Sequence, residues 1–165
     1  MDHIVYLALG TNLGNRLLNL SAAIGNLTPQ MKVKKKSPVY ETPPWGFADQ
    51  PAFLNQVVQV ETYEGPERLL KHLKRLETAL GRVPNFQNGP RLIDIDILFY
   101  DDLVLDTASL VIPHPRLHER AFVLVPLADI APDLVHPVLH KSVREMLAGV
   151  SSDEIEKVTR QTSSK

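Results

Sequence analysis

Two aspartates separated by one residue are the strongest chemical signal in the chain. Asp94 and Asp96 alternate with Ile93, Ile95 and Ile97, and alternate side chains of a β-strand lie on the same face. The two carboxylates would then lie about 7 Å apart at their Cα atoms, opposite the isoleucines. Carboxylate oxygens at this spacing suit Mg²⁺, which completes its coordination with water and substrate phosphates. The alternative is an amphipathic strand with a hydrated face, but aspartate is a poor strand former, which favours metal binding by about two to one.

Basic residues surround this pair in the sequence. Arg82 and Arg91 precede it, and Arg116 and Arg120 follow it. A guanidinium matches the geometry of phosphate oxygens, although a single surface arginine usually needs no ligand. His114, which lies between two prolines, could donate to a phosphate, although a lone loop histidine is usually only hydrated. Together with a metal pair, these cations predict transfer from a nucleotide polyphosphate.

Alternating strand and helix patterns must position these residues. Strands are expected at 4–9, 32–40, 53–63 and 92–100, helices at 15–27, 66–80, 119–130 and 142–147, and loops at 41–50 and 82–90. The glycine-rich turn at 10–15 lacks the ending of a Walker A loop, so we expect Asn15 or Asn12 to cap the first helix. The order βαββαβ predicts an α+β, ferredoxin-like sandwich, with helices on one face of an antiparallel sheet and additional C-terminal helices. We expect one domain over residues 1–150 and a polar tail over 151–165 that frays.

The composition limits the classes of protein. The formal net charge is −1, which argues against a surface built for non-specific nucleic-acid binding. The absence of cysteine excludes thiol catalysis and disulfides. No apolar run approaches the roughly 20 residues that span a membrane, and the first residues do not resemble a signal peptide. We therefore expect a cytoplasmic protein that binds neither nucleic acid nor membrane.

Several segments, taken in order, resemble the hydroxymethyl-dihydropterin pyrophosphokinase family of folate biosynthesis. The resemblance extends from residue 9 to about residue 133. Its most specific segments are 40–44, 49–51, 53–55, 77 with 81–82, 89–91 with 93–96, and 113–114. It implies that the pterin hydroxyl attacks the β-phosphorus of ATP in line, so that a pyrophosphoryl group is transferred and AMP is released. The implied partners are ATP and hydroxymethyl-dihydropterin, and we expect a monomer.

The resemblance also implies a set of site residues. Two magnesium ions would bind Asp94 and Asp96, and Arg82 and Arg91 would stabilise the transferring group. The pterin would lie between two aromatic rings and against three edge residues: Phe53 and Phe122, with Thr42, Pro43 and Asn55. The nucleotide and its phosphates would be surrounded by Glu77, Arg82, Arg91, Ile97, His114 and Arg120.

The loop before the aspartates departs from the family pattern. Asn88 stands where the family usually carries a tryptophan, and Pro84 stands in place of a second arginine. Two rival functions remain open. A non-catalytic binding module, such as an RNA-binding domain, would want basic and aromatic residues on the sheet face that carries the aspartates. A metal-dependent phosphodiesterase would need further carboxylate or histidine ligands, for which Glu77 is the only nearby candidate.

Overall fold

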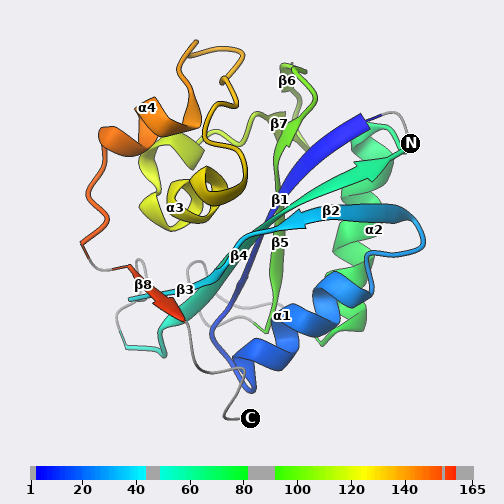
Figure 1. Cartoon of the computed structure of the whole chain (residues 1–165). Coiled ribbons are helices and arrows are strands. Elements are labelled where there is room, and N and C mark those ends of the chain that lie inside the picture. The colour runs from blue at the N-terminus through cyan, green and yellow to red at the C-terminus, as the bar shows by residue number, and fades with distance from the viewer. Residues whose placement is uncertain (1–2, 44–48, 82–91, 154, 159–165) are drawn as a thin grey trace.

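The sheet at the centre of the molecule is antiparallel. The computed structural model describes residues 3–43, 49–81, 92–153 and 155–158. The strand order is β5-β1-β4-β3-β8, and β2 also pairs with β4 (Figure 1). The strands are β1 (His3–Thr11), β2 (Met31–Lys36), β3 (Val39–Thr42), β4 (Phe53–Thr62), β5 (Asp94–Tyr100) and β8 (Glu156–Val158). A separate small ribbon joins β6 (Leu105–Asp106) to β7 (Val111–Ile112).

Helices cover both faces of this sheet. α1 (Arg16–Gly25) and α2 (Pro66–Ala79) pack on one face, where Leu20 and Leu73 enter the larger core. α3 (Ala121–Ile130) and α4 (Val143–Ala148) cover the other face, where Leu127 and Met146 enter a second core. Figure 1 shows these two pairs on opposite sides of the strands. The prediction of helices on one face describes α1 and α2, but the additional C-terminal helices form a third layer.

Local sequence signals explain where most helices begin and end. The Asn15 side chain accepts a hydrogen bond from the Leu18 backbone N–H at 3.1 Å and caps α1, as the sequence predicted. Pro66 occupies the first turn of α2, where its missing N–H is not needed. Gly81 follows α2 with a φ of +102°, a conformation that glycine adopts without steric cost. A reciprocal pair of hydrogen bonds between Ser142 and Glu145 caps α4.

The region expected to form one strand at 32–40 is instead divided between β2 and β3. Both pair with β4, and Ser37 and Pro38 separate them. Pro38 has no N–H to donate. The Ser37 hydroxyl accepts from the Val57 N–H at 2.9 Å, and the Ser37 carbonyl accepts from the Gln56 amide at 2.8 Å. Ser37 therefore supplies hydrogen-bond acceptors to β4 between the two strands.

Three other boundaries differ from the sequence expectation. β1 continues through Gly10 to Thr11, where we expected glycine to end the strand. A 3₁₀ turn, η1 (Leu117–Glu119), precedes α3, which begins at Ala121. β8 lies within the polar tail that we expected to fray, and it pairs with the edge of β3. The backbone partners that decide the β1 and β8 boundaries come from distant parts of the chain, whereas local hydrogen bonds close the turn before α3.

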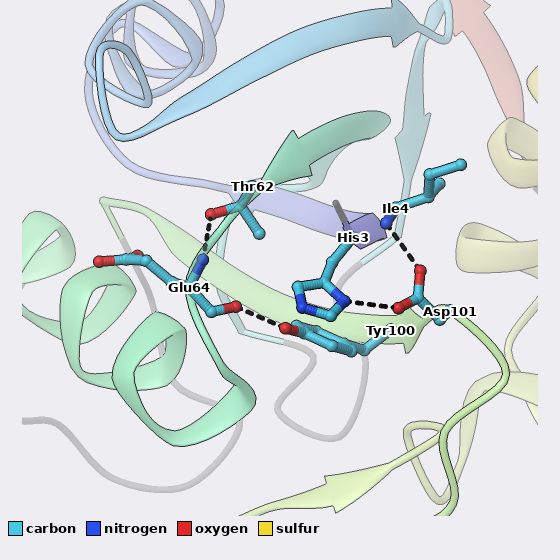
Figure 2. A network of polar contacts seen from close by, with 6 residues as sticks. All are labelled: His3, Ile4, Thr62, Glu64, Tyr100 and Asp101. Carbon is cyan, nitrogen blue, oxygen red and sulfur yellow. Dashed lines mark hydrogen bonds and ion pairs between the residues drawn. The ribbon is translucent and has the colours of Figure 1, made fainter. Parts of the chain in front are cut away.

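A polar network ties together the strand ends farthest from Gly10 (Figure 2). The carboxylate of Asp101, just after β5, accepts from the Ile4 N–H at 2.8 Å and lies 2.7 Å from His3 Nδ1. The hydroxyl of Tyr100 donates to the Glu64 carbonyl beyond β4. Burial raises the pKa of the Tyr100 hydroxyl, and the carboxylates of Asp101 and Glu64 add to this effect. This end of the sheet is therefore closed by side-chain contacts.

Candidate active site

The aspartates of β5 lie on the face that the sequence predicted. Ile93 and Ile95 are each 1% exposed and pack in the core beneath α1 and α2. Asp94 and Asp96 are partly exposed and line a pocket on the opposite face. The alternation of side chains between the two faces of β5 stops after Leu98, because a β-bulge there shifts the pairing between β1 and β5. The predicted separation of isoleucines from aspartates is therefore confirmed.

The pocket lies at the open end of the sheet, against the start of α3. Its volume is about 130 Å³. It brings together nine of the predicted site residues, namely Thr42, Pro43, Phe53, Asn55, Asp94, Asp96, His114, Arg120 and Phe122. It is also lined by residues that the sequence reasoning did not select, among them Ala8, Gly10, Gln56, Leu98 and Val123. Apart from Gln56, whose amide donates to the Ser37 carbonyl, these residues are small or apolar, so no chemical signal marked them in the sequence.

One side of the pocket combines aromatic rings with a buried amide. The Asn55 amide of β4 donates to the Thr42 hydroxyl of β3 at 2.9 Å, and both side chains are buried. Phe53 lies on β4, whereas Phe122 lies on α3 and has the Arg120 guanidinium 5.6 Å from its ring centroid. Aromatic rings with a few fixed polar groups suit a planar heterocycle.

The other side of the pocket combines carboxylates with cationic and neutral donors. The His114 backbone N–H donates to the Leu98 carbonyl at 3.0 Å, which fixes the loop against β5. Burial lowers the pKa of His114, the Asp96 carboxylate opposes this effect, and Arg120 and Arg116 reinforce it. His114 Nδ1 accepts from the Arg116 backbone N–H at 3.2 Å, so a neutral ring carries its proton on Nε2. That nitrogen can donate to an anionic ligand.

Burial also lowers the pKa of Arg120, Arg116 adds to this effect, and Asp96 and Glu119 oppose it. A guanidinium stays charged in proteins, so Arg120 supplies a cation to the same pocket as the two aspartates. The ring of His114, which the resemblance places around the nucleotide, therefore lies in a pocket where a carboxylate and a guanidinium both act on it.

Two of the predicted nucleotide residues lie outside this pocket lining. Glu77 of α2 is 1% exposed, and its Oε2 accepts from the Ile95 backbone N–H at 2.6 Å. It therefore contacts the edge of β5 at the residue between the two aspartates. Ile97 is buried in the core beneath α1 and α2. The nucleotide contacts expected of Glu77 and Ile97 stay predictions, and Arg82 and Arg91 lie outside the described residues.

The carboxylate pair fits a metal that shares its coordination with a substrate. In the described part of the chain, no group of three or more histidine, cysteine, aspartate or glutamate side chains could hold a metal ion. Asp94 and Asp96 therefore offer a partial set of hard oxygen ligands. Mg²⁺ is usually held by one or two carboxylates together with water and substrate phosphates, so this donor set suits Mg²⁺ brought in with a nucleotide. In addition, no helix among the described residues is long and apolar enough to cross a membrane.

One pocket on an antiparallel sheet that combines carboxylates and cations with aromatic rings fits the class of nucleotide-dependent transferases that act on flat acceptors. The sequence profile of the 7,8-dihydro-6-hydroxymethylpterin-pyrophosphokinase (HPPK) family matches residues 6–132. The chain therefore belongs to this family, whose members are ATP-dependent pyrophosphokinases of folate biosynthesis.

Relatives of two different lengths resemble this chain. The 2-amino-4-hydroxy-6-hydroxymethyldihydropteridine pyrophosphokinase of Methylorubrum extorquens is 46% identical over 155 residues, which are 93% of this chain and 97% of that protein. The folic acid synthesis protein FOL1 of Dictyostelium discoideum is 44% identical over 145 residues, which are 88% of this chain but 22% of that protein. The chain thus spans about a fifth of the length of such larger relatives.

Solved structures show the same fold at lower sequence identity. The crystal structure of Plasmodium falciparum HPPK-DHPS, wild type with pteroate, has a TM-score of 0.75 and 19% identity. The similarity covers 89% of this chain and 44% of that chain.

Proposed function

We propose that this chain transfers the pyrophosphoryl group of ATP to the hydroxymethyl group of 6-hydroxymethyl-7,8-dihydropterin and releases AMP. The observation that carries this proposal is the single pocket that holds both halves of the site. Phe53, Asn55 and Phe122 offer a place for a planar heterocycle, and Asp94 and Asp96 lie in the same pocket. Direct transfer requires the acceptor and the phosphates to be held within reaction distance.

The roles of the phosphate side follow from its charges. Asp94 and Asp96 would hold two Mg²⁺ ions, which when bound neutralise phosphate charge and lower the pKa of the attacking hydroxyl. Arg120 would balance the remaining phosphate charge, and His114 would donate from Nε2. Arg82 and Arg91 would stabilise the transferring group.

The roles of the acceptor side follow from its shape and its hydrogen bonds. Phe53 and Phe122 would stack on the two faces of the pterin, and Thr42, Pro43 and Asn55 would line its edge. The hydrogen bond from Asn55 to Thr42 fixes the orientation of the amide, which favours one orientation of the ring. No general base is required, because positioning and charge neutralisation are the main terms in phosphoryl transfer.

The finer fold assignment is part of the same proposal. The order β5-β1-β4, continued by β2 and β3 on the far edge of β4, supports a ferredoxin-like core in which β2 and β3 share the place of one strand. The domain boundary at residue 150, a monomeric state and a cytoplasmic location stay predictions.

One assay tests the proposed reaction against its rivals. The protein is incubated with ATP and Mg²⁺, with and without hydroxymethyl-dihydropterin, and AMP is measured. We expect AMP only when the pterin is present, together with an equal amount of pterin diphosphate. A phosphodiesterase that also cleaves ATP would release AMP without the pterin, and a binding module would release no AMP. Either outcome would contradict the proposal.

A further inference from the structure

Gly10 occupies an unusual position for a glycine. It lies within β1, paired with Asn55 of β4 on one side and with Asp94 of β5 on the other. Glycine in the interior of a strand costs stability, because it loses more backbone entropy than other residues and has no side chain to pack. Only Gly14 and Gly81 have a positive φ among the glycines that the structure describes. The backbone of Gly10 therefore does not require a glycine.

Space explains this glycine better than backbone conformation. A Cβ atom at Gly10 would lie 3.3 Å from Asn55 Oδ1, which is tighter than an ordinary contact. The next atoms would be the Leu54 carbonyl oxygen and Phe53 Cδ2, both at 3.9 Å. All three atoms belong to β4 and none to β5. A side chain at Gly10 would therefore press on the aromatic and amide half of the pocket.

Asn55 has little freedom to withdraw from such a side chain. Its Nδ2 donates to the Thr42 hydroxyl at 2.9 Å, and both residues are buried. A shift of the Asn55 amide would lengthen this hydrogen bond or turn the amide away from the pocket. Leaving a buried polar group without a hydrogen-bond partner is unfavourable. The neighbour that would have to move is therefore one whose position matters for binding.

The position of Gly10 also links the two halves of the pocket. Asn55 and Asp94 flank it in one row of the sheet, and strands lie about 4.8 Å apart. Ala8, two residues earlier on the same face of β1, lies between Val57 and Asp96. The two smallest residue types thus form the part of the pocket floor that lies between the amide and the carboxylates. A reacting arm that extends from the heterocycle towards the phosphates would pass over this floor.

We propose that Gly10 is a specificity-determining residue for the planar acceptor. Its missing side chain lets Asn55 and Phe53 take the positions that bind the heterocycle, and it leaves the floor open for the hydroxymethyl arm. This inference rests on the proposed function, because it assumes that the acceptor occupies the Asn55 side of the pocket.

The variant Gly10→Ala tests this inference. The KM for hydroxymethyl-dihydropterin rises by at least about ten-fold, equivalent to about 1.4 kcal/mol of acceptor binding. The Kd for a non-hydrolysable ATP analogue with Mg²⁺ changes by less than about two-fold, since the nearest atoms to the new methyl group all lie on the acceptor side. The midpoint of thermal unfolding changes little, because the better fit of alanine than glycine to a strand interior offsets the strain at the Asn55 amide.

Gly25→Ala is the matched control. A Cβ atom at Gly25 would meet nothing within 4 Å, and this residue lies on α1, away from the pocket lining. Both the KM for the pterin and the Kd for the nucleotide analogue should match those of the wild type.

Three outcomes would overturn the inference about Gly10. The first is an unchanged KM for the pterin in Gly10→Ala, and the second is an equal loss of nucleotide and pterin affinity. The third is a Gly10→Ala protein that unfolds at a clearly lower temperature, since the glycine would then serve the fold. Assay of the wild-type protein distinguishes a failure of the inference about Gly10 from a failure of the proposed function. If the wild type releases no pterin-dependent AMP, the proposed reaction fails, and direct binding of the pterin to wild type and Gly10→Ala then decides the role of Gly10.

Discussion

At the scale of single residues, Asp96 interacts with two of the cationic or protonatable side chains of the pocket. Burial lowers the pKa of His114 and of Arg120, and the Asp96 carboxylate opposes this effect in both cases. It also shares a face of β5 with Asp94, and both line the pocket. The carboxylate thus acts on two positively charged or protonatable side chains and is one of two candidate ligands for Mg²⁺.

We predict that Asp96→Asn abolishes transfer while the protein stays folded. The amide has almost the same size but no charge, so a metal bound there would lose a ligand whose effect on the transition state is worth several kcal/mol. Turnover should fall at least about 100-fold, which corresponds to about 2.7 kcal/mol. The measurement is pterin-dependent AMP release, with thermal unfolding as the check on the fold. Asp106→Asn on β6, where the side chain is exposed, is the matched control. Near-normal AMP release by folded Asp96→Asn protein would rule out the metal site.

At the scale of elements, the contact between α2 and β5 holds the aspartate strand in place. Among the described residues, β5 lies at one edge of the sheet and pairs with β1 alone, so its outward N–H groups need other partners. Glu77 supplies one of them through its hydrogen bond with Ile95. Lys74 of the same helix lies 3.5 Å from the other oxygen of Glu77. The buried carboxylate thus links helix and strand between the two aspartates.

Substitution of Glu77 separates the hydrogen bond from the charge. Glu77→Ala should lower the free energy of unfolding by about 1–3 kcal/mol, because it leaves the buried Ile95 N–H without this acceptor. Glu77→Gln keeps an acceptor oxygen and should lose clearly less. Urea denaturation of both variants measures the difference. Equal losses in the two variants would show that the charge of Glu77, and not its hydrogen bond to Ile95, is the main contribution.

The connection between α3 and α4 contains a histidine whose protonation should affect stability. His136 Nδ1 accepts from the Val138 and Leu139 N–H groups, both at 3.1 Å, and its ring packs edge-on against Phe99. Burial lowers the pKa of His136 below its ordinary value of 6.5, and His118 and His140 add to this effect. The folded state therefore favours the neutral ring, whose Nδ1 can accept both hydrogen bonds.

The sign of the pH effect follows from this lowered pKa. The unfolded chain binds a proton at His136 more readily than the folded protein. The contribution of His136 to stability is therefore complete above pH 6.5 and is lost as the pH falls from 6.5 towards the lower pKa of the folded state. We expect His136→Asn, which can still offer a side-chain acceptor, to show a smaller loss of stability between pH 7.5 and 5.5. Chemical denaturation at several pH values measures this, and identical pH profiles for the two proteins would contradict it.

At the scale of the whole molecule, the pocket exists because the C-terminal layer packs against the same face as the aspartates. Phe122 and Val123 at the start of α3 form its wall, and β1, β4 and β5 form its floor. The Tyr40 hydroxyl of β3 donates to the Asp129 carboxylate of α3 and fastens this layer to the sheet. Burial raises the pKa of Tyr40 to about 12, and the contact with Asp129 adds to this effect.

We predict that Tyr40→Phe weakens the attachment of α3 to the sheet. The variant keeps the ring but removes the hydroxyl, so the free energy of unfolding should fall by roughly 1 kcal/mol, the usual net value of a hydrogen bond. Tyr63→Phe, at a largely exposed position, is the control and should change stability little. The raised pKa means that the contribution of Tyr40 is complete below pH 10 and is lost as the pH rises towards 12. Equal stability of both variants at neutral pH would show that the contact contributes nothing.

The features that the sequence alone determined are those set by near neighbours along the chain. The two-residue period of a strand separates Asp94 and Asp96 from the buried isoleucines. Asn15 can reach the first turn of α1, and Pro66 suits the first turn of α2, without help from distant residues. The fold class and most elements follow from such patterns, because periodicity and capping act over only a few residues.

Only the tertiary structure decided which distant residues meet. The division of β2 from β3 at Ser37 depends on Val57 and Gln56 of β4. The packing of α2 decides that Glu77 meets the backbone of β5 at Ile95, a contact that its position in the sequence does not reveal. Gly10 carries no chemical signal, and its importance depends on Asn55, 45 residues later, lying beside it in the sheet. The reason is the same in each case, since the energy of these contacts belongs to pairs brought together by folding and not to either residue alone.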